Sequence, residues 1–195
     1  MKRMAVVFMI GLLGALGGAP VFAATYEIDR VHSHVGFRIR HLVSKSKGSF
    51  DSFSGTIEFD EKAPEKSSVS VTIDTASINT AVSKRDDHLR SADFFDVKQF
   101  PVMTFVGNKV TDVKPETFKV HGELTMHGVT KPVVLEVALG GTMKGEKGEW
   151  IAGFTGSTKV SRKDFGLKGG APMLGDEVEI SLEVEARTKP AAPAK

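Results

Sequence analysis

Six histidines have the widest chemical range in this chain, because a neutral imidazole can bind a metal ion or transfer a proton. They are His32, His34, His41, His88, His121 and His127. Residues at alternate positions share a strand face, so His32 and His34 form one pair and His121 and His127 another. Neither spacing matches a metal-ligand motif, and the chain has no Cys to supply a thiolate. We therefore predict no metal site and interpret the histidines as hydrogen-bonded residues near strand ends.

An acid–base pair is the second chemical candidate. Asp86 and His88 lie two residues apart in a charged segment that also contains Arg85, Asp87 and Arg90. Covalent catalysis needs a nucleophile beside the base, and no Gly-x-Ser-x-Gly motif marks a serine for that role. The simpler interpretation of the segment is a surface helix with charged ends. The sequence therefore predicts neither an enzyme nor a cofactor.

The phenylalanines indicate binding rather than catalysis. The chain has 13 Phe beside one Trp and one Tyr, and a phenyl ring has no polar group, so it favours a dry environment. Gly55, Gly122, Gly153 and Gly156 occupy expected strand positions, where glycine leaves room for a close approach. Two interpretations follow: an apolar cavity that holds a ligand, or a core that the same side chains fill. Composition alone does not choose between them.

Alternation of apolar and polar residues predicts the elements that hold these side chains. Eight or so segments have one apolar and one polar face, within residues 35–39, 53–60, 69–74, 103–105, 118–127, 133–139, 151–158 and 178–185. Short links rich in Gly, Asn, Asp and Pro join them. This spacing is typical of an antiparallel sandwich or barrel.

Two segments lack this alternation. Residues 78–96 predict a short helix near 79–92, with Asn79 or Thr80 as its N-cap. Residues 162–176 contain four glycines and Pro172, which predict a long irregular loop. A loop of this length in a compact domain is either functional or mobile.

Both ends of the chain are predicted to lie outside the folded domain. Residues 1–23 join Lys2 and Arg3 to an apolar run, and the pattern predicts a signal peptide cleaved after Ala23. Residues 188–195 are rich in Pro and Ala and predict a disordered tail, which leaves one domain at 24–187. Without the signal peptide, Lys plus Arg equals Asp plus Glu, so nucleic acid is not an expected partner.

A series of short motifs follows in a fixed order along the predicted domain. They are Tyr26-Glu27-Ile28-Asp29, His32-Ser33-His34-Val35-Gly36-Phe37, Phe53-Ser54-Gly55-Thr56-Ile57, Arg85-Asp86-Asp87-His88-Leu89, Asp93-Phe94-Phe95-Asp96, Gly122-Glu123-Leu124-Thr125-Met126-His127-Gly128 and Arg162-Lys163-Asp164-Phe165-Gly166. With these motifs in this order, the chain resembles the YceI-like family over nearly the whole predicted domain.

The resemblance implies a fold and a ligand. The fold is all-β: an extended, antiparallel, eight-stranded, lipocalin-like barrel. The ligand is a polyisoprenoid, such as an isoprenoid quinone or a polyprenyl phosphate, sequestered in a long central cavity. Together with the signal peptide, this implies a periplasmic or secreted lipid-binding protein. The alternative is a non-enzymatic stress-response or interaction protein with a filled barrel. A homodimer and transient membrane contact stay open as further partners.

Candidate site residues follow from their positions in the motifs. The apolar cavity positions are Phe37, Phe50, Phe53, Leu89, Phe94, Phe105, Leu124, Met126 and Phe165. The polar motif positions are Arg85, Asp86, His88, His127 and Arg162. These polar residues either contact a ligand or support the helix and the loop. Segments 79–96 and 162–176 are expected to form a lid at the mouth of the barrel, where the head group of the ligand would lie.

Overall fold

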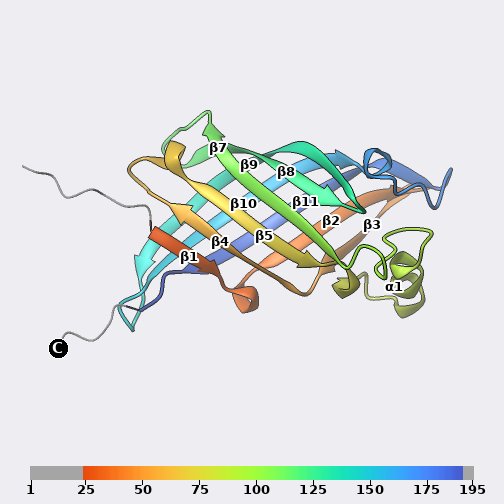
Figure 1. The fold of residues 1–195 in the computed structure, drawn as a ribbon, viewed down its shortest axis with the longest axis horizontal. Coiled ribbons are helices and arrows are strands. Elements are labelled where there is room, and N and C mark those ends of the chain that lie inside the picture. The colour runs from red at the N-terminus through yellow and green to blue at the C-terminus, as the bar shows by residue number, and fades with distance from the viewer. Residues whose placement is uncertain (1–23, 191–195) are drawn as a thin grey trace, which may run out of the picture.

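The computed structural model describes residues 24–190, which form a long antiparallel β-barrel (Figure 1). The strands are β1 (Ala24–Ile28), β2 (His34–His41), β3 (Ser44–Phe50), β4 (Phe53–Phe59), β5 (Ser68–Asp74), β6 (Ile78–Asn79), β7 (Val102–Thr111), β8 (Thr117–Met126), β9 (Val129–Lys144), β10 (Trp150–Ser161) and β11 (Leu174–Arg187). Short 3-10 helices occur at η1 (Arg30–His32), η2 (Pro64–Lys66), η3 (Thr75–Ser77) and η4 (Arg162–Phe165). The α-helix α1 spans Ser83–Arg90. Within residues 24–190 no helix has the length and apolar character needed to cross a membrane.

The barrel closes through an eight-strand ring in the order β1-β4-β5-β7-β8-β9-β10-β11, and β11 pairs again with β1. Beyond the short β1, β11 continues its pairing with β2, and β2 pairs with β3. Thus β1 and β2 are two halves of one interrupted strand, and β3 and β4 are two halves of the next. The predicted eight-stranded, lipocalin-like antiparallel barrel is confirmed.

The eight segments that showed alternation all form strands of the barrel, except that Asp60 and His127 directly follow the ends of β4 and β8. In the cross-strand register, Phe105 stands opposite Val71 on β5 and Leu124 on β8, while Val120 stands opposite Leu135 on β9. These apolar rows face the interior, because side chains alternate between the two faces of a strand. The hydrophobic core is therefore the inner surface of the closed sheet.

The segment near 79–92 is helical as predicted, but its predicted N-cap is wrong. The residue at the N-cap is Val82, which makes no side-chain cap hydrogen bond. Thr80 is a donor instead: its backbone N and its Oγ1 donate to the Asp86 carboxylate at 2.8 and 2.5 Å. An N-cap side chain accepts hydrogen bonds from the helix, whereas Thr80 donates to a side chain of the helix. The Asp86 carboxylate therefore holds the segment that precedes α1.

Besides the two-residue β6, two strands had no alternation signal. β3 has the sequence SKSKGSF, whose polar residues continue on both faces until Phe50. β1 is only five residues long. Both are strands because neighbours pair with them: β3 pairs with β2 along its whole length, and β1 with β4. At the other terminus, Thr188 exchanges hydrogen bonds with Trp150 at 2.9 Å. The predicted signal peptide and residues 191–195 of the predicted tail lie outside the described residues.

The interruption between β1 and β2 is bridged by a side chain. Residues 29–33 leave the strand to form η1, so β11 loses its backbone partner opposite Glu185. Ser33 replaces that partner, since its Oγ donates to the Glu185 carbonyl at 3.1 Å and accepts from the Glu185 N–H at 3.0 Å. The Asp29 N–H donates to the same carbonyl at 2.8 Å. An unpaired backbone group here would be costly, so these bonds preserve barrel closure.

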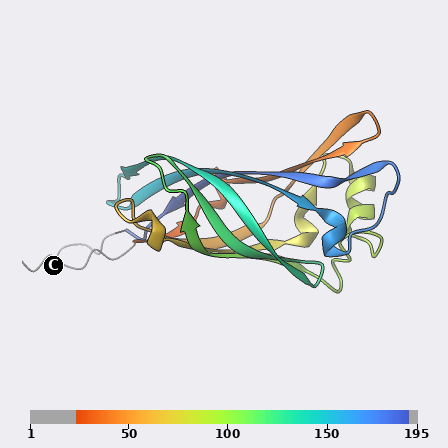
Figure 2. The ribbon, with the colours of Figure 1, turned by 90° about the horizontal axis from the view of Figure 1, so that it is seen from above.

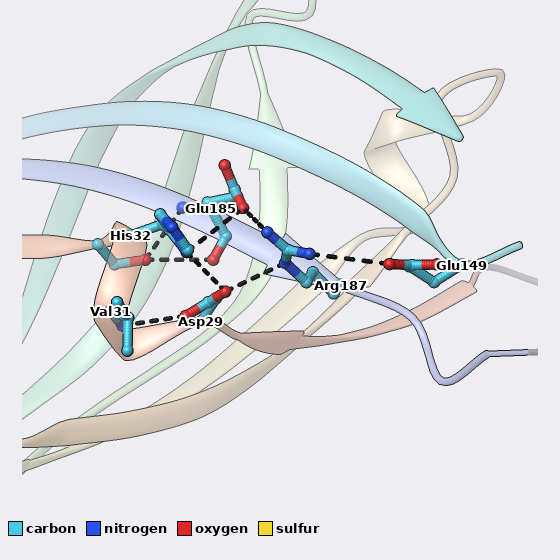
Figure 3. A network of polar contacts seen from close by, with 7 residues as sticks. Asp29, Val31, His32, Glu149, Glu185 and Arg187 are labelled. Atoms are coloured by element: carbon cyan, nitrogen blue, oxygen red, sulfur yellow. Dashed lines mark hydrogen bonds and ion pairs between the residues drawn. The ribbon is translucent and has the colours of Figure 1, made fainter. Parts of the chain in front are cut away.

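A polar network covers the same junction (Figure 3). The Asp29 carboxylate contacts His32 Nδ1 at 2.9 Å and forms an ion pair with Arg187 Nε at 3.1 Å. Arg187 Nη2 contacts Glu185 at 2.6 Å. The hydrogen bond from His32, the N–H of Val31 and the charges of His32 and Arg187 hold the pKa of Asp29 below its usual value. The charged form of Asp29 therefore favours the closed barrel.

The pKa of Asp29 predicts a pH-dependent contribution to stability. Asp29→Asn should lower the free energy of unfolding at pH 7 by about 0.5–1 kcal/mol, because the ion pairs are partly exposed. A depressed folded-state pKa stabilises above the unfolded value of about 3.9 and loses that effect as pH falls through the folded pKa. Urea unfolding of both proteins at pH 7, 5 and 3 should show the difference shrinking only at the lowest pH. An equal difference at all three pH values would contradict this assignment.

Candidate functional site: an apolar cavity within the barrel

The interior of the barrel is not filled. It contains a cavity of about 470 Å³, within the range of small-molecule sites. Every strand of the closed ring contributes apolar inward-facing residues, and the contribution of the short β1 is Ile28. The cavity runs from the end of the barrel that contains Phe59, Phe118 and Phe154 to the end that carries α1 and the loop before β11.

Most of the predicted apolar site residues lie on the cavity wall. Eight of the nine are lining residues: Phe37, Phe50, Phe53, Leu89, Phe94, Phe105, Leu124 and Met126. Phe165 is the exception. Phe165 is the last residue of η4, is 2% exposed and belongs to the hydrophobic core, but it does not line the cavity. Its assignment to the cavity wall is therefore corrected, and its contact with a ligand is not proposed further.

The motifs missed most of the wall. Residues outside them also line the cavity, among them Val69, Val71, Val120, Leu135, Val137, Phe154, Val160, Val178, Ile180, Leu182 and Val184. Alternation predicts these residues, because each lies two positions along its strand from another inward-facing residue. On β11, for example, Val178, Ile180, Leu182 and Val184 form the predicted apolar face and all four line the cavity.

The strand glycines have different roles. A Cβ at Gly55 or Gly122 would lie 2.5 Å from a backbone carbonyl oxygen of the neighbouring strand, so these two permit close approach. A Cβ at Gly153 would meet nothing within 4 Å. Gly156 lines the cavity, where a Cβ would meet only the Leu182 side chain, at 3.2 Å. Of the four, Gly156 is the one that leaves space for a ligand.

Aromatic rings narrow the barrel at the end opposite α1. The Phe59 ring lies 5.1 Å from the Phe154 ring, 6.4 Å from the Phe118 ring and 6.4 Å from the Tyr26 ring. Edge-to-face and stacked rings at these distances pack tightly. The cavity is therefore a tunnel with an aromatic floor, and its other end is the candidate mouth.

The mouth is formed by the two segments that were expected to form a lid. Leu89, Phe94 and Phe95 line it from the α1 region, and Leu167 and Met173 line it from the loop between η4 and β11. Figure 2 shows α1 and this loop at the same end of the barrel. The two segments lie together at one end of the barrel, as predicted. Their opening and closing as a lid stays a prediction.

Arg162 supports the loop at the mouth. Its side chain is 4% exposed, and its guanidinium donates to the carbonyls of Leu167, Gly169 and Gly175 at 2.6–2.8 Å. The nearest carboxylate oxygen, on Asp176, lies 3.8 Å from Nη2. Nη2 has no hydrogen-bond partner within residues 24–190, and Arg162 also lines the cavity. The residue thus supports the loop and presents a positive charge to the cavity wall.

Arg85 and Asp86 support the segment before α1. Arg85 donates from Nε to Thr80 Oγ1 at 2.7 Å and from Nη2 to the Thr80 carbonyl at 2.8 Å. Asp86 is buried and holds Thr80 from the other side. Arg85 is a lining residue and Asp86 is not. Of this pair, only Arg85 is placed to meet a ligand.

The two predicted histidines differ in position. His88 lines the mouth, with Nε2 at 3.0 Å from Asp93 and its ring centre 5.0 Å from that of Phe94. His127 lies in the β8–β9 turn at φ 51°, with its ring 4.5 Å from Phe100, outside the cavity lining. Only His88 is therefore placed to meet a ligand in the cavity.

The lining carries positive charge and no negative charge. Arg85 and Arg162 are its charged members, and no Asp or Glu among residues 24–190 lines the cavity. Within the same residues, one group has metal-ligand spacing: Asp29, His32 and Glu185 at the β1–β2 junction. Arg187 is paired with both of its carboxylates. That group belongs to barrel closure and lies away from the cavity.

Fold and cavity together define a class of protein: a lipocalin-like antiparallel barrel with an apolar interior. The YceI-like domain model matches residues 26–186, and the chain belongs to this family, which has a binding-protein fold. A UPF0312 protein of Azotobacter vinelandii is 40% identical over 173 residues, covering 87% of this chain and 90% of the relative. Protein YceI of Salmonella arizonae is 41% identical over 188 residues, covering 95% and 97%.

Solved structures show the same barrel. Burkholderia cenocepacia BcnA superimposes with a TM-score of 0.75 at 25% identity, covering 81% of this chain and 98% of that one. The Campylobacter jejuni YCEI protein gives 0.71 at 38% identity, covering 77% and 90%. A polyisoprenoid-binding domain from Saccharophagus degradans gives 0.66 at 16% identity, covering 85% and 99%, a likeness of fold alone.

The contacts of Arg162 predict its effect on stability. Arg162→Met should lower the free energy of unfolding by about 3 kcal/mol, because three carbonyls lose a charged donor. Hydrogen exchange should accelerate most in residues 166–175. Lys163→Met is the matched control, since Lys163 is half exposed and its ion pair with Asp176 is worth less than about 1 kcal/mol. Equal effects of the two substitutions would refute a supporting role for Arg162.

Proposed function

We propose that the protein binds a polyisoprenoid lipid in the barrel cavity and sequesters or carries it in the periplasm. The continuous apolar cavity of about 470 Å³ is the observation that carries this proposal. Burial of an apolar chain gains about 0.8 kcal/mol per CH₂, so a long chain binds without strong polar contacts. A filled barrel, as a stress-response or interaction protein would have, leaves no such space.

The mouth favours a head group that accepts hydrogen bonds. Arg85, His88 and Arg162 face the cavity at this end, and no carboxylate accompanies them in the described lining. The carbonyls of an isoprenoid quinone and the oxygens of a polyprenyl phosphate both suit these donors. A cationic head group would meet Arg85 and Arg162 without a compensating negative charge.

Catalysis on the bound lipid is not part of the proposal. His88 is the one member of the Asp86–His88 pair that lines the cavity, while the Asp86 carboxylate is already occupied by Thr80. His88 has Asp93 as a partner at 3.0 Å, but covalent catalysis also needs a nucleophile beside the base, and no sequence motif marks one. We therefore propose binding alone, with no enzyme activity and no cofactor beyond the bound lipid.

The ligand is tested by blocking the cavity. Gly156→Phe places a phenyl ring in the tunnel, which displaces at least two methylenes and should lower lipid per protein by about tenfold. Ser157→Phe is the matched control, because Ser157 is exposed on the outer face of the same strand. Organic extraction and mass spectrometry of protein from the native host measure the bound lipid, and thermal unfolding verifies that both variants fold. Wild-type protein that carries no lipid and takes up no added quinone would refute the proposal.

Export is tested by the mass of the protein. Protein from a periplasmic extract should have the mass of residues 24–195, because a signal peptidase requires the small residue Ala23 before the cleaved bond. Ala23→Arg should block cleavage and keep the protein in the membrane fraction. A full-length mass in the soluble periplasmic extract would contradict the proposed cleavage.

A further inference from the structure

An apolar tip stands at the mouth of the barrel. Leu42 and Val43 form the turn between β2 and β3, and their exposed fractions are 53% and 104%. Met173, in the loop before β11, is 50% exposed. The Leu42 N–H donates to the Met173 carbonyl at 2.9 Å, so these residues from distant parts of the chain form one tip. In Figure 2 the hairpin (orange) and the loop (blue) lie at the same end of the barrel.

Folding alone does not account for this turn. A two-residue hairpin turn favours Asn or Gly, because at least one residue adopts positive φ. Here Leu42 has φ 50°, a conformation that costs a bulky side chain about 1 kcal/mol or more. The chain thus places two large apolar side chains in water, at a position where small polar residues would fold more easily.

Basic residues surround the tip. On the β2–β3 hairpin, Arg38 stands directly opposite Lys47 and Arg40 directly opposite Lys45. All four residues are exposed. Like charges in opposite positions destabilise a strand pair. Residues 30–50 contain five Lys or Arg and no Asp or Glu.

Neighbouring acids neutralise only part of this charge. Glu179 on β11 pairs with Lys45 at 2.6 Å. The next acids along β11, Glu177 and Asp176, are already paired with Lys159 and Lys163. The hairpin therefore keeps a net positive charge beside its apolar tip.

The tip is continuous with the cavity. Met173 and Leu174 line the mouth, and so do His41 and Ile39 from the hairpin. An object that covers the tip therefore also covers the opening through which a ligand would pass.

We propose that this tip docks the barrel on an anionic lipid bilayer, with Leu42, Val43 and Met173 inserted at the interface and the surrounding cations on the head groups. A few apolar side chains surrounded by Lys and Arg form the pattern of a peripheral membrane contact. A stable protein interface needs about 800 Å² per partner with a broad apolar core, and three side chains do not supply it. The docking goes beyond lipid sequestration and does not depend on which ligand fills the cavity.

Vesicle sedimentation tests the charge and the apolar tip. Wild-type protein should bind vesicles of phosphatidylcholine with 30% phosphatidylglycerol and lose this binding in 0.5 M NaCl or on pure phosphatidylcholine. Leu42→Ser with Val43→Ser should weaken binding by about tenfold, because apolar insertion is lost. Met143→Ser with Val113→Ser is the matched control, since both residues are exposed and apolar at the opposite end, and it should bind as wild type.

A second variant separates docking from folding. Lys47→Glu places opposite charges across from each other at the Arg38 position, which should raise the melting temperature. It also lowers the net charge of the hairpin by two units, so binding to the anionic vesicles should fall by about tenfold. A misfolded variant would lose stability and binding together. Unchanged vesicle binding by this variant and by the double serine variant would overturn the proposal.

The single tryptophan locates the contact. Trp150 lies at the end opposite the tip, so brominated lipids should leave its fluorescence unchanged. In a Trp150→Phe background, Val43→Trp should be quenched strongly. Quenching of Trp150 in the wild-type chain would overturn the orientation proposed here.

Sedimentation velocity without vesicles tests whether the tip is instead an interface between two copies of the chain. A dimer that the double serine variant abolishes would make the tip a protein interface and overturn membrane docking.

Discussion

Closure of the sheet on β11 is the constraint on which the structure depends. A sheet edge left open would expose unpaired N–H and C=O groups along 14 residues of β11. The neighbouring strand is broken into β1 and β2, which both pair with β11, and Ser33 and Asp29 bond to Glu185 across the gap between them. The polar cluster around Arg187 reinforces the same seam. The charged groups with metal-ligand spacing therefore serve closure.

Closure also explains the cavity. Once the sheet closes, every inward apolar side chain must be buried in one shared interior, whatever its position in the sequence. Aromatic rings around Phe59 fill one end, where the strands bring four large side chains together. Along the middle, the cross-strand neighbours Gly156 and Val137 both line the cavity, and the glycine supplies no side chain to fill it. The interior is therefore a tunnel that is closed by rings at one end and edged by α1 at the other.

The polar motif residues mainly stabilise backbone at this second end. Asp86 and Arg85 hold Thr80, and Arg162 holds three carbonyls of the loop before β11. Buried or half-buried loops need such partners because water does not satisfy their backbone groups. Two of these residues also face the cavity as cations. Support of the mouth and the electrostatic character of the mouth thus come from the same side chains.

The sequence by itself determined which side chains face inward, since alternation depends only on strand geometry and every alternating segment is a strand. It also located the helix, and eight of the nine apolar residues that it assigned to the cavity line the cavity. It missed β1 and β3, whose strand conformation comes from pairing with neighbours rather than from their own residues. Tertiary structure alone decided that Phe165 packs in the core and that Phe165, Asp86 and His127 do not line the cavity. The reason is that alternation along a strand fixes the sheet face on which a residue lies. Its position along the tunnel depends on how strands that are distant in the sequence are staggered against one another.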